Sequence, residues 1–241
     1  MPTDILKMGT HFLKVIIDFK SFATLPLKYY NPIAMKKLVL QRIFFVLSVF
    51  IAGNANAQSD FIAAISEIKM FQQELDKEYR DPAKSPLGKK AAQFQGHEFF
   101  PINLKFRITA KLNVKSNSPF FMMKTTSIYP SEERIYGMLE FSLEGKKYQL
   151  PVYQSSSLMK TQEYKDYLFF PFTDLTNGFE TYHGGRYIDL RIPEGEEIII
   201  DFNKAYNPYC AYASGFSCPI VPKENHIEMR IPVGIKYQEK K

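Results

Sequence analysis

The stretch that decides the fold is IYGMLEFSLEGKKYQLPV, residues 135–152, in which two apolar alternations flank a turn signal. Alternate residues from Ile135 to Leu143 are apolar or glycine, and the pattern resumes from Tyr148 to Val152. Apolar side chains at every second position give a β-strand one buried face. Glu144-Gly145 between the two runs fits a tight turn. The stretch therefore predicts an antiparallel hairpin with one side against a core.

The same alternation recurs along the chain at short spacing. It runs from Leu104 to Val114 and, as a predicted final strand, from Ile227 to Tyr237. Further strands are expected at residues 120–129, 167–172, 186–192 and 197–203. About eight strands with short polar connections predict a mainly β fold, either an antiparallel β-sandwich or a barrel-like single domain.

One amphipathic helix precedes the strands. Apolar residues recur at helical spacing from Phe61 through Ile68 to Tyr79, and Asp81-Pro82 should end the helix. We expect this helix to pack on the domain; a partner-binding helix is the alternative. From residue 58 onwards we therefore expect an N-terminal helical segment, residues 58–84, and a β-rich domain, residues 85–241.

A secretory signal pattern begins at Met35. A basic stretch is followed by ten apolar residues, Ile43–Ala52, and by the cleavage motif Ala55-Asn56-Ala57. Ten apolar residues are too few to span a bilayer. We therefore assign residues 35–57 to a signal peptide and expect export to the periplasm or the extracellular space, without a transmembrane anchor.

The predicted cleavage changes the charge of the chain. The mature protein would begin at Gln58, and residues 1–34 would be a non-native extension upstream of the true start. Residues 1–57 hold seven of the 31 Lys and Arg and two of the 25 Asp and Glu, so 24 basic and 23 acidic residues remain. This balance leaves no basic field for nucleic acid, which we exclude as a partner.

Cys210 and Cys218 are the only cysteines in the sequence. Export would place them in an oxidising compartment, where such a pair forms a disulfide. Half of a metal site is the alternative, but the spacing is not that of a zinc finger and there is no second pair. The sequence predicts a disulfide and no metal.

Catalytic motifs are interrupted. His97-Glu98 begins the H-E-x-x-H pattern, but Pro101 occupies the position of the second histidine. Gly215–Pro219 resembles a nucleophile elbow until its last residue, where Pro replaces Gly. The sequence has no phosphate-binding loop and no dinucleotide fingerprint, so no cofactor is expected and no catalytic residue is assigned.

Arg186 has an unusual position in its predicted strand. It shares strand parity with Ile188 and Leu190, so its guanidinium should face the core. Because an unpaired buried charge is very costly, we favour a clamp with Asp201 or Asp174. The alternatives are a side chain that extends to the sheet edge and an anion-binding arginine at the mouth of a pocket.

Two polar, turn-rich segments, residues 172–187 and 201–226, supply the remaining candidates. Tyr206, Tyr209 and Tyr212 could be core aromatics or a surface on which a sugar or another ring stacks. If the segments enclose a pocket, the candidate ligand-binding residues are Asp174, Thr181, Tyr182, Arg186, Tyr187, Asp201, Asn203, Tyr206, Asn207 and Asn225.

The motifs of these segments resemble one family. They are FPFTDLTNGFETYHGGRY, DFNKAYNPYCAY and CPIVPKEN, with SPLGKKAAQFQGHEFFPINLKFRITAKL upstream, and they are similar to the bacterial family of domains of unknown function numbered 1684. The resemblance covers Ser85 to Tyr237 and implies a β-rich domain of unassigned activity. His183 stands where we expect a small residue, and Ile235 replaces an expected glutamate, which argues against a catalytic carboxylate there. The family pattern includes Asp174, Thr181, Tyr182, Gly185, Arg186, Tyr187, Asp201, Asn203, Tyr206, Asn207, Cys210, Cys218 and Asn225.

Three functions fit this sequence. The first is binding of a small polar or anionic ligand between residues 174–187 and 201–225. The second is a hydrolase that uses Asp174 or Asp201 as a general base and Arg186 to hold an oxyanion. The third is a structural envelope protein whose polar residues only stabilise the fold. The sequence indicates no particular protein partner.

Overall fold

A computed structural model describes residues 32–237 of the chain. The chain divides into two units, Met1–Ser59 and Asp60–Lys241, and helix α2, Pro32–Arg80, contributes to both. Most of the predicted upstream extension lies outside the described residues. Within them, no helix is long and apolar enough to cross a membrane.

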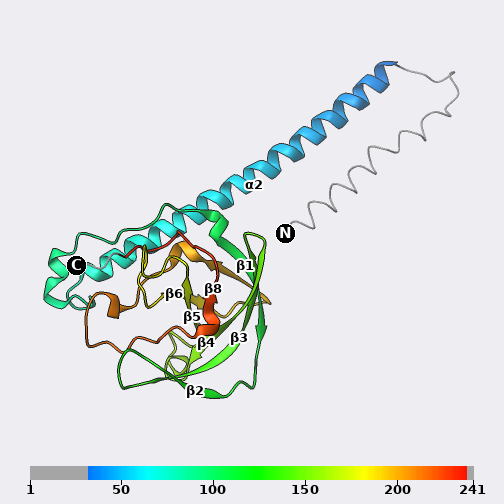
Figure 1. Cartoon of the computed structure of the whole chain (residues 1–241). Coiled ribbons are helices and arrows are strands. Elements are labelled where there is room, and N and C mark those ends of the chain that lie inside the picture. The colour runs from blue at the N-terminus through cyan, green and yellow to red at the C-terminus, as the bar shows by residue number, and fades with distance from the viewer. Residues whose placement is uncertain (1–31, 238–241) are drawn as a thin grey trace. The chain divides into compact units, whose positions relative to one another are not determined.

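The second unit is built on one curled sheet, a half-barrel (Figure 1). Its main path has the order β6-β5-β4-β3-β1-β7, and all of these neighbours are antiparallel. Strand β2 adds to β3, and β8 pairs in parallel with β5. The barrel-like, mainly β prediction is therefore confirmed. The strands are β1 (Arg107–Val114), β2 (Phe120–Met123), β3 (Ser131–Leu143), β4 (Lys146–Ser155), β5 (Tyr167–Asp174), β6 (Arg186–Arg191), β7 (Glu197–Asp201) and β8 (His226–Ile227).

The predicted hairpin is formed by β3 and β4. Leu139 lies opposite Leu150 in the ladder. Glu144 and Gly145 both have positive φ, 48° and 81°, which is the backbone of a two-residue hairpin turn whose twist matches the strands. The alternation and the turn residues thus specify the same register.

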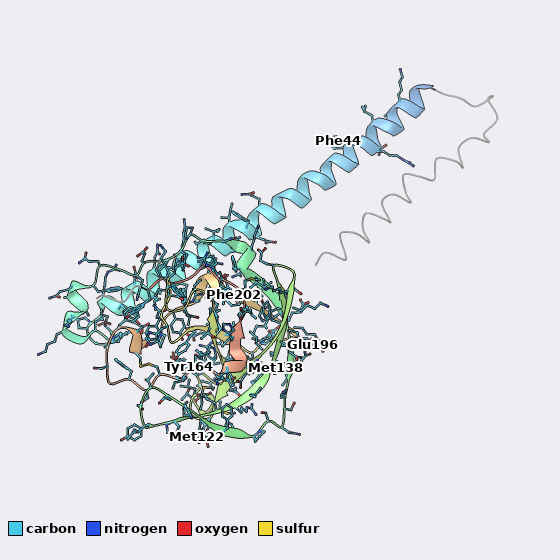
Figure 2. All side chains as sticks on the ribbon, viewed as in Figure 1. Phe44, Met122, Met138, Tyr164, Glu196 and Phe202 are labelled. Carbon is cyan, nitrogen blue, oxygen red and sulfur yellow. A yellow bond between two sulfur atoms is a disulfide. The ribbon has the colours of Figure 1, made fainter. Side chains whose placement is uncertain are left out.

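The two faces of the sheet are both covered in part. The inner face carries the main core, and the Phe202 ring lies inside it (Figure 2). The outer face carries a smaller cluster of Met123, Tyr153, Phe169 and Tyr187. A segment that follows β7 packs on this outer cluster, and it positions the candidate site described below.

The predicted final strand, Ile227–Tyr237, is wrong beyond its first residue. Ile231, Val233 and Ile235 are buried in alternation, as expected, but only His226–Ile227 joins a ladder. The carbonyls of Ile231 and Val233 accept hydrogen bonds from the Arg186 side chain instead. At these two carbonyls a side chain takes the place of a neighbouring strand, while other backbone groups of the segment bond to scattered loop residues.

The end of strand β2 and the start of the packed face of helix α2 also differ from prediction. Strand β2 ends at Met123 instead of residue 129, because the chain turns around the Thr125 hydroxyl, which donates to the Tyr129 carbonyl at 2.7 Å. Helix α2 ends at Arg80, as predicted. Ile68 and Tyr79 are buried, but Phe61 is 53% exposed, so the packed face of the helix begins after it.

Candidate functional site

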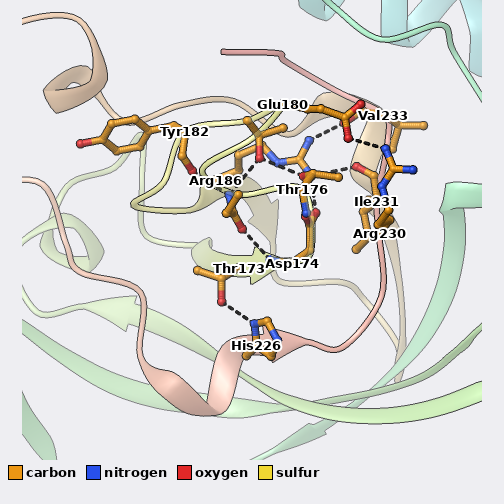
Figure 3. Close-up of polar contacts among 12 residues, drawn as sticks. Thr173, Asp174, Thr176, Glu180, Tyr182, Arg186, His226, Arg230, Ile231 and Val233 are labelled. Atoms are coloured by element: carbon orange, nitrogen blue, oxygen red, sulfur yellow. Dashed lines mark hydrogen bonds and ion pairs between the residues drawn. The ribbon is translucent and has the colours of Figure 1, made fainter. Parts of the chain in front are cut away.

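Arg186 forms a buried clamp (Figure 3). Its guanidinium is fully buried and donates to Asp174 Oδ2 at 2.5 Å, to the Ile231 carbonyl at 2.9 Å and to the Val233 carbonyl at 2.5 Å. It also lies over the Phe172 ring, 5.1 Å from the centroid. The clamp with Asp174 is thus the arrangement the structure shows. An arginine at a pocket mouth or at the sheet edge is wrong, because no part of Arg186 is exposed.

The turn before β6 holds both partners of the clamp in place. Asp174 Oδ1 accepts from the Thr176 backbone N–H at 2.6 Å and from its hydroxyl. The Thr176 and Thr181 hydroxyls bond at 2.9 Å. Gly185 has φ +94°, and a Cβ there would lie 2.7 Å from the Phe172 carbonyl, so only glycine fits before Arg186. Asp174 and Thr181 are therefore used within the fold.

Asp201 does not pair with Arg186, which corrects that part of the prediction. It accepts from Arg107 at 2.6 Å and from the Asn203 side chain at 2.8 Å. Arg107 also bonds to Glu67 of helix α2 at 2.8 Å. Asn203 bonds in turn to the backbone of Asn103. This network joins the helix to the end of β7.

The other predicted residues mostly fasten the loop after β7. Asn225 accepts from the Tyr153 hydroxyl at 2.8 Å and donates to the Pro151 carbonyl at 2.9 Å. Asn207 donates to the Tyr212 hydroxyl at 2.9 Å. The Tyr187 hydroxyl donates to the Pro219 carbonyl. Cys210 and Cys218 are disulfide-bonded, which confirms that prediction. Tyr182 packs edge-on against Tyr237, with 5.2 Å between ring centroids.

Tyr206 belongs to a different arrangement, centred on Asp189 of β6. Tyr206 exchanges two backbone hydrogen bonds with Tyr187, at 2.9 and 3.0 Å, and so lies against the edge of β6. Its hydroxyl donates to Asp189 Oδ1 at 2.6 Å, and the Tyr167 hydroxyl donates to the same oxygen at 2.7 Å. Among the described residues, none hydrogen-bonds to Asp189 Oδ2. Asp189 is an exposed residue whose carboxyl is desolvated by surrounding protein atoms, and Oδ2 is the oxygen that the fold leaves without a hydrogen bond.

A second tyrosine–carboxylate pair lies beside the first. Tyr209, in the short helix η7 (Tyr209–Ala211), donates its hydroxyl to Glu78 of helix α2. The negative charge of Glu78 acts on Asp189 and contributes to the raised pKa of its carboxyl. We call Asp189, Tyr167, Tyr206, Tyr209 and Glu78 the tyrosine–carboxylate cluster.

The ionisation of the cluster follows from its packing. Surrounding protein atoms partly desolvate the Asp189 carboxyl and raise its pKa, although the residue is exposed, while the two phenol donors oppose this rise. Burial and the charge of Asp189 raise the pKa of Tyr206 well above 10.0. Tyr206 therefore keeps its proton and remains a hydrogen-bond donor to the carboxylate.

Glu133 lies on the same outer face of the sheet. It is 3% exposed, and Oε1 accepts from the Ser131 hydroxyl at 2.6 Å, but Oε2 is buried without a partner among the described residues. Burial raises the pKa of Glu133. The charge of Glu133 in turn contributes to the raised pKa of Tyr167, a donor to Asp189.

The sequence indicates Tyr206 and Tyr209 as candidates, but it does not single out Asp189, Tyr167 or Glu133. The available signal was parity: Asp189 alternates with the core residues Ile188 and Leu190, so it had to face away from the core. Its neighbours in space come from strands and loops distant in sequence. Tertiary structure was needed to bring them together.

His97 also has a buried atom without a hydrogen-bond partner among the described residues, Nε2. His97 is buried and bonds to Asp76 at 2.7 Å. An open groove of about 210 Å3 contains none of the predicted ligand-binding residues; it is lined by Lys69, Gln72, Gln73, Asp76 and Phe99. Among the residues that the structure describes, no group of three His, Cys, Asp or Glu could hold a metal ion.

Comparison with known proteins identifies a family and a fold. No curated protein matches the chain. The solution NMR structure of an uncharacterised protein from Haloarcula marismortui matches with a TM-score of 0.60 and 27% sequence identity, over 76% of this chain and 99% of that one. A family model described as "Protein of unknown function (DUF1684)" matches residues 92–236. Since this match spans more than half of the chain, the protein belongs to the DUF1684 family.

Proposed function

We propose that this protein binds a small polar ligand at the tyrosine–carboxylate cluster. The observation that carries the proposal is the geometry of Asp189. Two phenol hydroxyls hold one carboxylate oxygen, and the other has no hydrogen-bond partner among the described residues on an exposed surface. A fixed carboxylate beside aromatic rings can accept hydrogen bonds from a ligand while the rings contact its apolar parts.

The neighbouring charges favour a hydrogen-bond-donating ligand and disfavour an anionic one. Arg186, the predicted anion-binding residue, is buried against Asp174. Arg191 of β6 is already bonded to Asp166 at 2.8 Å and to the Glu163 carbonyl at 2.7 Å. Arg186 is therefore unavailable to an anion and Arg191 is already paired, so the anionic part of the original expectation loses its support.

The hydrolase alternative loses its proposed machinery. Its general base was Asp174 or Asp201, and both are buried and bonded within the fold. Arg186 would have to release Asp174 and two carbonyls to hold an oxyanion. A structural role remains the second candidate, because most residues of the family pattern fasten the loop after β7 to the sheet.

We also propose that the protein is exported as residues 58–241. The predicted mature start, Gln58, lies two residues before the compact unit that begins at Asp60. The disulfide is compatible with an oxidising compartment. The ligand would then be a compound found outside the cytoplasm.

Native mass spectrometry of the protein purified from its own cells tests the binding proposal. We expect an adduct on the wild type that is lost in Asp189→Asn, which keeps the size of the side chain and an acceptor for the tyrosines. Glu140→Gln is the matched control, because Glu140 is an exposed carboxylate on the same sheet. An adduct that survives Asp189→Asn, or no adduct in any form, would favour the structural role.

A further inference from the structure

We infer that the ligand of the tyrosine–carboxylate cluster is a small organic cation that carries a primary ammonium group. This inference rests on the proposed function and names its ligand class. It follows from three features of the outer face of the sheet: the balance of charge, the unpartnered Glu133 and the orientation of the tyrosines.

The charge around Asp189 is negative. Asp189 and Glu78 both accept hydrogen bonds from neutral tyrosines, so no described basic side chain neutralises them. Arg191, the nearest guanidinium along β6, forms its ion pair with Asp166. The Arg191 charge still acts on Asp189 and lowers the pKa of its carboxyl, whereas Glu78 raises it. The carboxylates of Asp189, Glu78 and Asp166 nevertheless outnumber this one guanidinium, and the excess negative charge favours a cationic partner.

Glu133 is an independent observation that indicates the same chemistry. It lies opposite Ser155 of β4, on the face that Tyr167 shares. Its buried Oε2 lacks a partner, and no described cation lies within ion-pair distance of it. A buried carboxyl oxygen without a hydrogen-bond partner needs an explanation, and a bound cation is one. An ammonium group bound at Asp189 would supply favourable charge to Glu133 as well.

The tyrosines are suited to an ammonium group. Their hydroxyl protons are committed to Asp189 and Glu78, so each phenol oxygen presents lone pairs, which accept N–H donors. Their rings also attract cations. The Arg191 guanidinium already lies over Tyr164 and Tyr167, 5.5 and 5.8 Å from the ring centroids. A ligand ammonium would use the same attraction.

The test compares two probes that differ in charge but hardly in size, butylammonium chloride and 1-butanol. Each is titrated into the 15N-labelled full chain at neutral pH and constant ionic strength. We expect butylammonium to shift the amide signals of Asp189 and Tyr206 and to bind at least about tenfold more tightly than 1-butanol, because its hydrogen bonds to carboxylate are charge-assisted.

Substitutions then show which residues bind butylammonium. Asp189→Asn should weaken butylammonium at least about tenfold, Glu133→Gln should weaken it less, and Glu140→Gln should leave it unchanged. Thermal melts confirm that each variant is folded. Equal binding of the two probes, undiminished binding by Asp189→Asn, or no binding of butylammonium would overturn the cation inference. The adduct experiment above judges the proposed function separately, since a neutral adduct that depends on Asp189 would support binding while excluding a cation.

Discussion

Arg186 and Glu133 are both buried ionisable residues, and they differ in their partners. Arg186 has a carboxylate, two carbonyls and an aromatic ring around its guanidinium. Glu133 has one serine hydroxyl. A buried charge is tolerated when it is paired and is costly when it is not. Arg186 therefore fits a structural role, and Glu133 fits a ligand-binding site.

Arg186→Met should strongly destabilise the domain. The substitution leaves Asp174 as a buried charge without its counterion and removes the donors to two carbonyls. Breaking such a pair typically costs about 3–5 kcal/mol, which is a large share of the stability of one domain. Denaturant unfolding followed by circular dichroism measures the change.

Two further variants separate the effect of breaking the ion pair from the effect of replacing an arginine by methionine. Arg191→Met, at the exposed end of the same strand, should cost less than about 1 kcal/mol. Arg186→Met combined with Asp174→Asn should recover part of the loss, because Asn keeps the acceptor for Thr176 without a charge. A stable single Arg186→Met variant would contradict the clamp.

Glu133→Gln should stabilise the domain at neutral pH. Because burial raises the pKa of Glu133 above its ordinary value of 4.5, the folded protein keeps a proton that the unfolded chain releases. The favourable contribution of Glu133 is complete below pH 4.5 and is lost as the pH rises towards the folded pKa. The variant removes this loss, so its free energy of unfolding should exceed that of the wild type by about 1 kcal/mol at pH 7. The two proteins should differ little at pH 4.

Denaturant unfolding from pH 4 to pH 8 measures this effect. Glu132→Gln is the control, since Glu132 is the exposed neighbour on the same strand, and its pH profile should match that of the wild type. If Glu133→Gln loses stability at pH 7, the carboxylate has a favourable partner in solution.

At the scale of elements, the segment after β7 does most to build the site. It pairs with the edge of β6 through Tyr206, carries Tyr209 to helix α2 and is closed by the disulfide. It contains little regular structure beyond short 3-10 helices such as η6 (Phe202–Lys204). Side-chain hydrogen bonds and one covalent bond hold it in place.

Removing the disulfide should therefore loosen the site as well as the fold. Cys210→Ala with Cys218→Ala should cost roughly 2.5 kcal/mol in the chain-entropy model for a short loop. We expect the amides near Tyr206 and Tyr209 to lose more hydrogen-exchange protection than those of the β3–β4 hairpin. Thiol counting on the denatured, unreduced wild type should find no free thiol; two free thiols would exclude the bond.

At the scale of the whole molecule, the proposed export would determine which residues make up the working protein. The compact unit that begins at Asp60 holds every member of the proposed site. If the signal pattern that begins at Met35 is cleaved as we propose, residues 1–57 are dispensable after secretion. The two observations come from different parts of the chain and agree on the boundary.

We expect N-terminal sequencing of the secreted protein to begin at Gln58. Expression from Met35 should give the same product and the same yield, because the basic, apolar and cleavage regions all lie downstream of that residue. A mature protein that retains the Ile43–Ala52 segment would show that this segment anchors it.

The sequence by itself determined most of the strands, the hairpin register, the helix end, the disulfide and the family. These depend on alternation, on turn residues such as Glu144-Gly145 and on motifs, all of which are local along the chain. Parity also placed Arg186 on the core face. It could not choose between Asp174 and Asp201, because both carboxylates were compatible with a buried arginine.

Only the tertiary structure decided that choice and located the site. Arg186 uses the carbonyls of Ile231 and Val233, so the predicted final strand lacks a ladder although its burial alternates as expected. Asp189 meets Tyr167 and Tyr206 because the sheet curls and a later segment returns to its edge. Contacts between residues far apart in sequence depend on how the strands pair, and no local pattern encodes that pairing.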